Sequence, residues 1–480
     1  MSEVRIKAGG ANSVVETHSI DYIPWSERRG KLWHQAPFWF TGNFVLPTML
    51  VGFIGPQMGL SLGYSFLAIV LGACFGTFFM AFHANQGPRM GMPQMIQSRA
   101  QFGSRGAIVP FLATVLVYVG FMVFNVVLST QGLDLILPLP NLVWYPIVAI
   151  VGIGIAVIGH DLLHFIQRWL VYLLIVAFAI MLVLAFTTLP APAPEQVGDW
   201  NLTAFLVQFS LAAGYNISYA VYVSDYSRYL PPRSSAPKLI FYTYVGAVAS
   251  AVWLMGLGSV LASRLPNVDA IMTVKQVGDN FFPGFGTIVV LIASAALISI
   301  MGVNAYGAML TSISGIDAFR RVPATRRTRV IALIVIGVLV VVISLFLPED
   351  YLGSFNNLVL LMLYFLIPWT AVNLVDFYFV RHGKYAITEI FKPNGIYKRW
   401  SWRGLVAYFA GFFAMVPFIS LPDVFTGPIA NAIGGADFSF AIGLIVAGGV
   451  YLIVARDIDF QKEAAARKES QFELEGGDLE

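Results

Sequence analysis

Long apolar runs dominate this sequence and decide what it can fold into. Each is close to the roughly 20 residues that an α-helix needs to cross the hydrocarbon core of a bilayer. Only 11% of the residues are charged, whereas a soluble domain carries about 25%. The sequence therefore predicts an all-α polytopic membrane protein with about twelve transmembrane helices. The predicted spans lie near residues 33–58, 62–84, 106–131, 142–160, 168–188, 204–224, 239–262, 285–314, 328–347, 354–379, 404–422 and 436–455.

The distribution of basic residues gives the orientation independently of hydropathy. With the N-terminus inside, the inner loops carry most of the arginines and lysines, and the outer loops carry only Arg264 and Lys275. Lysine and arginine collect on cytoplasmic loops of membrane proteins. Both termini are therefore predicted to be cytoplasmic, in a plasma or inner membrane. The inner-loop residues include Arg28, Arg29, Lys31, Arg89, Arg99, Arg105, Arg228, Arg233, Lys238, Arg320, Arg381, Lys384, Lys398 and Arg399.

Two of the spans have polar, glycine-containing middles. The first contains Gly42 and Asn43 followed by Pro47, and the sixth contains Gly214, Tyr215 and Asn216. Glycine and proline loosen a helix, and unwound backbone in a membrane is tolerated where it lines a cavity. Breaks in spans one and six are what a five-plus-five inverted repeat produces. A kinked helix whose asparagine bonds a neighbour is the alternative.

The predicted organisation follows from these spans. The segment 86–106, rich in Gly and Pro, is interpreted as a basic cytoplasmic loop that fixes topology, with a gating role as the alternative. The predicted units are a cytoplasmic tail at 1–32, a first five-helix repeat at 33–203, an inverted second repeat at 204–380, a cytoplasmic loop at 381–403, two further spans at 404–455 and a cytoplasmic tail at 456–480.

The polar groups inside the predicted spans are neutral. Amides and hydroxyls recur there, whereas Asp, Glu, Lys, Arg and His fall at span ends. Charged substrates and transported protons usually meet an ionisable side chain at depth. Amides read donor and acceptor edges, and aromatic rings stack on flat heterocycles. The interior thus suits a neutral, planar, hydrogen-bonding solute, although most aromatic residues in such a chain serve packing.

The sequence lacks the motifs that would indicate other classes of protein. The sequence contains no phosphate-cradling loop, no His/Cys metal spacing, no catalytic cluster and no nucleic-acid-binding patch. Cys74 is the single cysteine, so an intramolecular disulfide is excluded. An enzyme, an ATP-driven pump and a nucleic-acid-binding protein are therefore not expected, and no cofactor is predicted.

Three segments resemble the nucleobase–cation symporter family, in its purine–cytosine permease branch. They are S-R-A-Q-F-G-S-R-G at Ser98–Gly106, D-Y-S-R-Y-L-P at Asp225–Pro231, and N-L-V-D-F-Y-F-V-R-H-G-K-Y at Asn373–Tyr385 followed by N-G-I-Y at Asn394–Tyr397. The resemblance extends from Ile20 to about Arg456. It implies a leucine-transporter-like fold, with spans one and six broken and two extra helices at the C-terminal end.

The resemblance also implies a substrate pocket of aromatic and amide side chains. Its third-span aromatic falls on Phe121 and its amide on Asn125, and its eighth-span amide falls on Asn304. The sixth-span aromatic follows Gly214, itself a predicted substrate-site residue, and falls on Tyr215, or on Asn216 when counted back from Asp225. The first-span contacts fall within Gly42–Thr48, with Asn43 and Thr48 as the side-chain candidates.

A coupling cation has candidate ligands on spans one and eight. The family pattern of a carbonyl and two adjacent hydroxyls falls on Ala295, Ile298 and Ser299, so isoleucine replaces one hydroxyl. Backbone carbonyls near Gly42–Leu46 complete the predicted Na⁺ site. A serine bonded to its own i−4 carbonyl is the alternative reading of Ser299. Proton coupling is the other possibility, with Asp225 as carrier.

These features predict a secondary active transporter that imports a neutral nucleobase, cytosine or a purine, by cation symport with alternating access. Allantoin, hydantoins or thiamine-type compounds are the alternative substrates. A nutrient sensor that binds the same ligand without moving it is a more remote alternative. The expected partners are the heterocycle, the coupling cation and the lipid bilayer, and the chain is expected to be a monomer.

Overall fold

The computed structural model describes residues 21–158, 160–192, 197–266, 268–320, 322, 325–348 and 351–475. Of the two predicted tails, residues 1–20 and 476–480 lie outside the described residues.

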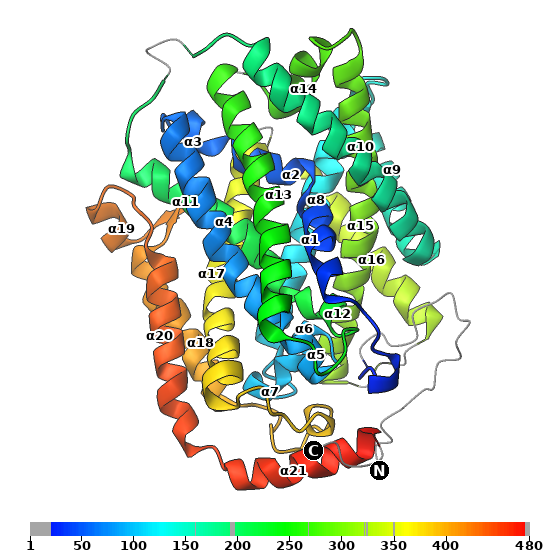
Figure 1. The fold of residues 1–480 in the computed structure, drawn as a ribbon, viewed down its shortest axis with the longest axis vertical. Coiled ribbons are helices and arrows are strands. Elements are labelled where there is room, and N and C mark those ends of the chain that lie inside the picture. Colours follow the sequence, from blue (N-terminus) through cyan, green and yellow to red (C-terminus); the bar gives the residue numbers. More distant parts are fainter. Residues whose placement is uncertain are drawn as a thin grey trace.

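Twelve apolar helical units within the described residues match the twelve predicted runs. Nine are single helices long enough to cross a membrane, one is a pair of helices with a 72° bend, and two are shorter. The long helices run side by side along the vertical axis of Figure 1. Apart from the bent pair, the spans are built on α4 (Leu62–Ala84), α8 (Ile108–Asp134), α9 (Asn141–Ile158), α10 (His160–Thr187), α11 (Leu202–Ile217), α13 (Ala236–Arg264), α15 (Phe285–Asp317), α16 (Arg326–Leu345), α17 (Tyr351–Val375), α18 (Trp402–Met415) and α20 (Ser439–Val454).

The first span is broken where the sequence predicted. It consists of α1 (Gln35–Asn43), α2 (Leu46–Val51) and the short α3 (Ile54–Gln57). Phe44 and Val45 leave the helical conformation between α1 and α2. Pro47 lies in the first turn of α2, where a missing N–H costs no helical hydrogen bond. The break therefore comes directly after Asn43.

The sixth span is broken later than predicted. Helix α11 continues through Gly214, Tyr215 and Asn216 to Ile217. The tighter turn η4 (Ser218–Val221) follows, and after a non-helical Tyr222 the chain resumes in α12 (Val223–Ser227). Gly214 serves helix packing instead, because a Cβ there would lie 2.7 Å from the Val359 carbonyl oxygen of α17. With breaks in spans one and six, the structure agrees with the five-plus-five arrangement.

The segment 86–106, interpreted from its composition as a basic cytoplasmic loop, is largely helical and packed into the bundle. It forms α5 (Gln86–Met90), α6 (Gln94–Gln97) and α7 (Arg99–Phe102), and nearly all of its side chains are buried. Two of its four glutamines bond to α17 and the turn after it: Gln86 Nε2 donates to Asn373 Oδ1 over 2.6 Å, and Gln101 Nε2 to Asp376 Oδ2 over 2.6 Å. These tertiary partners compensate the burial of polar groups.

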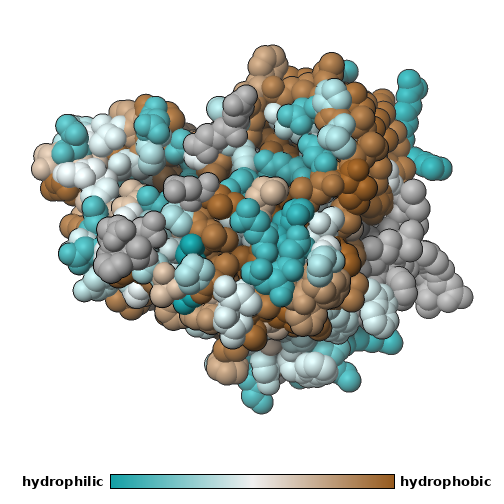
Figure 2. Space-filling model, turned by 90° about the horizontal axis from the view of Figure 1, so that it is seen from above, coloured by the Kyte–Doolittle hydropathy of each residue, from teal (hydrophilic) through white to brown (hydrophobic). Residues whose placement is uncertain are grey.

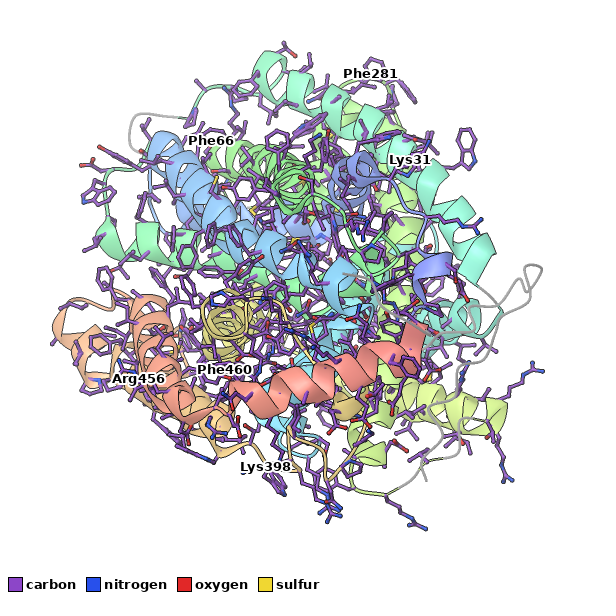
Figure 3. The ribbon with its side chains drawn as sticks, turned by 60° about the horizontal axis from the view of Figure 1, so that its bottom comes forward. Lys31, Phe66, Phe281, Lys398, Arg456 and Phe460 are labelled. Atoms are coloured by element: carbon purple, nitrogen blue, oxygen red, sulfur yellow. The ribbon has the colours of Figure 1, made fainter. Side chains whose placement is uncertain are left out.

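The first and last described residues, Asp21 and Glu475, lie at one end of the bundle, which we call the basic end (Figure 1). It comprises the segments 21–34, 86–106, 223–235 and 381–401 and the helix α21 (Phe460–Glu475), which crosses the ends of the spans. Figure 3 looks toward this end, with α21 in front, beginning at Phe460. The remaining short helices here are η1 (Trp25–Glu27), η2 (Leu32–His34), η5 (Asp376–Val380), η6 (Thr388–Ile390) and η8 (Ala455–Asp457).

Helix α21 holds the basic end together. Glu463 Oε1 accepts hydrogen bonds from Arg381 Nε over 2.8 Å and from the Tyr397 hydroxyl over 2.9 Å. At the other end of α21, Glu475 Oε1 accepts one from the Tyr22 hydroxyl over 2.7 Å. Within the predicted C-terminal tail, residues 460–475 thus form a docked helix that connects the end of span ten with the N-terminal segment.

The opposite end, called the far end, carries smaller elements. Helix α14 (Ala270–Asp279) precedes α15, and a two-stranded antiparallel sheet of β1 (Ser420–Leu421) and β2 (Phe425–Thr426) follows η7 (Val416–Phe418). Helix α19 (Pro428–Ala432) connects this sheet to α20. Figure 2 looks onto the far end, where hydrophilic side chains gather toward the middle and hydrophobic ones occupy much of the periphery.

Candidate substrate site

Asn43 links three helices at the break in the first span. Its side chain is 1% exposed. Its Nδ2 donates to Asn216 Oδ1 of α11 over 3.3 Å and to the Ala247 carbonyl oxygen of α13 over 3.0 Å. Its Oδ1 accepts a bond from the Tyr219 hydroxyl over 3.1 Å. A single amide therefore fixes the end of α1 against the sixth and seventh spans.

Thr48 makes the second connection between the two broken spans. Its hydroxyl donates to the Asn43 carbonyl oxygen over 2.6 Å, and it lies 2.9 Å from the Tyr215 hydroxyl. That carbonyl ends α1 and also accepts the Val45 N–H over 3.1 Å, so the threonine supplies its second hydrogen bond. Asn43, Thr48, Tyr215 and Asn216, all predicted as site residues, thus form one buried network.

Phe121 of α8 joins this network through its ring. The Phe121 and Tyr215 ring centroids lie 5.5 Å apart, with planes at 82°. This edge-to-face geometry is a favourable contact between the two rings themselves. A heterocycle stacked between them requires that the rings separate and turn toward parallel.

Asn125 lies one helical turn beyond Phe121 on α8. Its side chain is 3% exposed, and its Nδ2 has no hydrogen-bond partner in the described structure. An unpaired buried amide donor is costly and is explained by a water or ligand that supplies the acceptor. Asn304 of α15 is 8% exposed, and no described hydrogen bond joins it to the network around Asn43.

The predicted cation ligands differ in burial. Ser299 is buried, and its hydroxyl has no partner among the described residues, not even its i−4 carbonyl. Leu46 is buried at the start of α2, whereas Gly42 and Ala295 are exposed. Helix α15 packs mainly on α8, α9, α10, α14 and α16, and α2 packs on α13 and α11. No described hydrogen bond links the two halves of the predicted cation site.

The residues just beyond the network form an aromatic cluster that the sequence did not single out as a site. Trp39 lies 6.1 Å from Tyr219 and 6.3 Å from Tyr222, and Tyr118 stacks on Tyr222 at 5.6 Å, measured between centroids. The available signal was the spacing of Tyr215 and Tyr219, one turn apart on the sixth span. Residues at i and i+4 share a helix face.

Gln208 is a second residue without an assigned role in the sequence prediction. Its Nε2 donates to the Val51 carbonyl oxygen over 2.9 Å, and its Oε1 accepts from the Gly55 N–H over 2.8 Å. Both backbone groups lie where the first span is interrupted between α2 and α3. A buried backbone group in a membrane needs such a partner. Gln208 therefore supports the broken span from α11.

Comparisons with known proteins agree with this architecture. Residues 22–443 match the family described as permease for cytosine/purines, uracil, thiamine, allantoin. The Bacillus subtilis protein named "Putative purine-cytosine permease YxlA" is 37% identical over 448 residues, which cover 92% of this chain and 96% of that relative.

Two solved structures of Mhp1 are similar in fold. The inward-facing conformation has a TM-score of 0.75 at 16% identity and covers 98% of this chain and 100% of Mhp1. The closed conformation, titled as a nucleobase-cation-symport-1 family transporter with bromovinylhydantoin bound, has a TM-score of 0.71 at 17% identity, with coverage of 96% and 100%. At this identity the likeness concerns the fold alone.

Proposed function

The chain belongs to the family of permeases for cytosine/purines, uracil, thiamine and allantoin, and we propose that it imports a neutral nucleobase, cytosine or a purine, by cation symport with alternating access. It is a membrane transporter and not an enzyme. The proposal goes beyond the family in three respects: the substrate, the coupling ion and the direction of transport.

One observation carries the proposal. The network of Asn43, Thr48, Tyr215 and Asn216 joins the two broken spans next to Phe121, one turn from the unpaired amide of Asn125. Broken helices that meet near the bilayer midplane are where secondary transporters bind their substrates.

The chemistry of the site suits a nucleobase. Every side chain in the network is neutral, and amides offer a donor and an acceptor side by side. The Asn125 amide is proposed to read one edge of the base, and Asn304 a second edge once α15 approaches. Phe121 and Tyr215 are proposed to open from edge-to-face contact and stack on the ring. Gly214 is proposed to contact the substrate through its backbone, and its missing side chain also lets α11 pack against Val359 of α17.

For the coupling ion we propose Na⁺. The buried, unpartnered hydroxyl of Ser299 supports this assignment, because Na⁺ is held by oxygen ligands. The Ala295 carbonyl and carbonyls near Gly42–Leu46 would complete the site when span one approaches α15. Since cation binding would favour that arrangement, it would raise substrate affinity, and substrate would raise cation affinity equally.

The proposed orientation places the basic end in the cytoplasm, with both termini inside and the chain acting as a monomer in the cell membrane. Import then proceeds from the far end to the basic end. Lys and Arg are concentrated in the segments of the basic end, and this asymmetry supports the orientation.

The test is uptake of radiolabelled cytosine into proteoliposomes, with an inward Na⁺ gradient or with choline replacing Na⁺. Adenine, hypoxanthine and uracil serve as unlabelled competitors. Uptake that requires Na⁺ and is blocked by a nucleobase supports both substrate and ion. Uptake that ignores Na⁺ and collapses with a protonophore contradicts the Na⁺ site and favours a proton carrier. Asp225 is the candidate carrier, and its Oδ1 accepts the Gln94 N–H over 2.8 Å.

A second substrate class is favoured by one comparison. The closed Mhp1 structure holds bromovinylhydantoin, a heterocycle with amide edges like those of a base. Allantoin, a hydantoin and thiamine are therefore added to the competitor panel. Block by these compounds alone would transfer the assignment to them. If competitors shift thermal stability but no ligand is transported, the remote alternative of a non-transporting sensor is favoured.

A further inference from the structure

A cavity lies at the basic end, away from the candidate substrate site. It has a volume of about 350 Å³ and separates the end of span ten from α21. Part of its lining comes from the run Asn373–Tyr385, which the proposed transport mechanism does not use. The lining residues are Val380, Arg381, His382, Lys384, Phe460, Glu463, Ala464 and Arg467. We call this cavity the α21 cleft.

The acidic groups near the cleft are already engaged. Arg381 forms ion pairs with Asp376 and Glu463. Asp376 Oδ2 also accepts the Tyr385 hydroxyl over 2.8 Å, and Glu463 Oε1 accepts the Tyr397 hydroxyl. Burial, together with the Glu463 carboxylate, raises the pKa of Tyr397 well above its usual value. Its phenol therefore remains a donor to that carboxylate.

The cleft has two further basic side chains that could bind an anion, those of Lys384 and Arg467. Lys384 is exposed and Arg467 is half-buried, and neither side chain forms an ion pair or hydrogen bond with a described residue. His382 is exposed and lies between Arg381 and Lys384 in the sequence. Its Nδ1 lies 2.8 Å from the Tyr378 carbonyl oxygen. Two unpaired cations on opposite walls, one on the 381–384 turn and one on α21, leave the cleft with excess positive charge.

The cleft also has an apolar wall at the edge of the bundle. Val380 and Phe460 line it, and Phe460 is 47% exposed. The neighbouring Phe379, at the end of span ten, is 69% exposed. Phe460 marks the start of α21 in Figure 3. Aromatic and basic side chains in this combination are typical of the level of lipid headgroups.

We propose that the α21 cleft binds the phosphate group of an anionic ligand, and that a phospholipid of the adjacent leaflet supplies it. The phosphate lies between Lys384 and Arg467, and the glycerol and upper acyl chains lie along Phe460 and Val380. Basic pockets at the ends of membrane helices bind anionic headgroups in this way. Bound lipid then bridges span ten and α21. A free phosphate carries the same chemistry but leaves the apolar wall uncovered.

The experiment measures the melting temperature of the purified full-length protein in detergent. Phosphatidylglycerol, phosphatidylcholine and inorganic phosphate are titrated separately. The double variant Lys384→Ala/Arg467→Ala removes the two unpaired cations. The control Arg233→Ala/Lys238→Ala removes two exposed basic residues elsewhere at the basic end. Native mass spectrometry counts the phosphatidylglycerol molecules retained by each protein.

Phosphatidylglycerol is expected to raise the melting temperature more than phosphatidylcholine does. In the double variant its half-saturating concentration should rise roughly 25-fold, since each basic residue near an anionic surface contributes about fivefold. The control should behave as the unmodified chain. A matching response to inorganic phosphate would support the anion site and overturn the lipid as its occupant. Equal stabilisation by both lipids, or unchanged binding in the double variant, would overturn the proposal.

Discussion

The hydroxyl oxygens of Thr48 and Tyr215 lie 2.9 Å apart and join the two broken spans of the bundle. Thr48 comes directly after the break in span one, and Tyr215 lies in the last turn of α11 before the break in span six. The same threonine hydroxyl donates to the Asn43 carbonyl oxygen. A movement of either span at its break must therefore change this contact.

Thr48→Val tests the connection. Valine keeps the shape of threonine and removes the hydroxyl, so the Asn43 carbonyl keeps only the Val45 N–H and the Tyr215 hydroxyl loses its contact with span one. We expect a loss of about 0.5–1.5 kcal/mol in stability, the net contribution of a buried hydrogen bond, together with slower substrate uptake. Thermal melting and uptake measure the two effects. Thr41→Val is the control, since the Thr41 hydroxyl bonds within its own helix to Pro37. Equal behaviour of the two variants would contradict the proposed connection.

Asn125→Ala separates binding from folding. Because the Asn125 Nδ2 has no described partner, its removal should leave the melting temperature close to that of the unmodified protein. Substrate uptake should show a KM raised roughly tenfold, the loss of one substrate hydrogen bond of about 1.5 kcal/mol. Asn43→Ala is the comparison and should lower both stability and uptake, because Asn43 bonds to α11 and α13. Normal uptake by Asn125→Ala would exclude it from the site.

The spans were predictable from the sequence because the length of an apolar run is a local property. The break after Asn43 was also predicted, but the break in span six was placed too early. A glycine such as Gly214 can loosen a helix or allow a neighbouring helix to approach closely. Only the position of Val359 on α17 shows that Gly214 allows a close approach. Such tertiary neighbours are invisible in a single sequence.

The same reason explains the error at 86–106. Its Gly, Pro and Gln residues are typical of a loop, yet Gln86 and Gln101 find buried partners on Asn373 and Asp376, more than 270 positions away along the chain. In the candidate site, residue type and the family resemblance led to Asn43, Thr48, Tyr215 and Asn216, which the structure joins in one network, and their contact with substrate stays a prediction. The role of Tyr219 depends on the orientation of its hydroxyl toward Asn43, which residue type does not specify.

Gly76→Ala tests the packing of α4 on α11. A Cβ at Gly76 would lie 2.2 Å from the Ala213 carbonyl oxygen, so the helices would have to move apart. We expect a destabilisation of about 1–3 kcal/mol from overpacking, read as a lower melting temperature. Gly63→Ala in the same helix is the control, since a Cβ there meets nothing within 4 Å. A melting temperature for Gly76→Ala equal to that of the control would show that the contact is looser than the structure indicates.

Arg381→Gln tests the buried charges beneath span ten. Asp376 is 0% exposed and pairs with Arg381, and it also accepts hydrogen bonds from Gln101, Tyr385 and Tyr451. Removing only the cation leaves Asp376 and Glu463 without their shared counter-charge, and breaking a buried ion pair typically costs about 3–5 kcal/mol. The double variant Asp376→Asn/Arg381→Gln removes both charges of one pair and should recover part of that loss. The amide oxygen still accepts from the donors on one side of the group, whereas its NH2 replaces an accepting oxygen on the other side. Thermal melting of the two variants in detergent measures the difference. A double variant less stable than Arg381→Gln alone would show that the hydrogen bonds to the carboxylate, and not the ion pair, dominate the stability of this cluster.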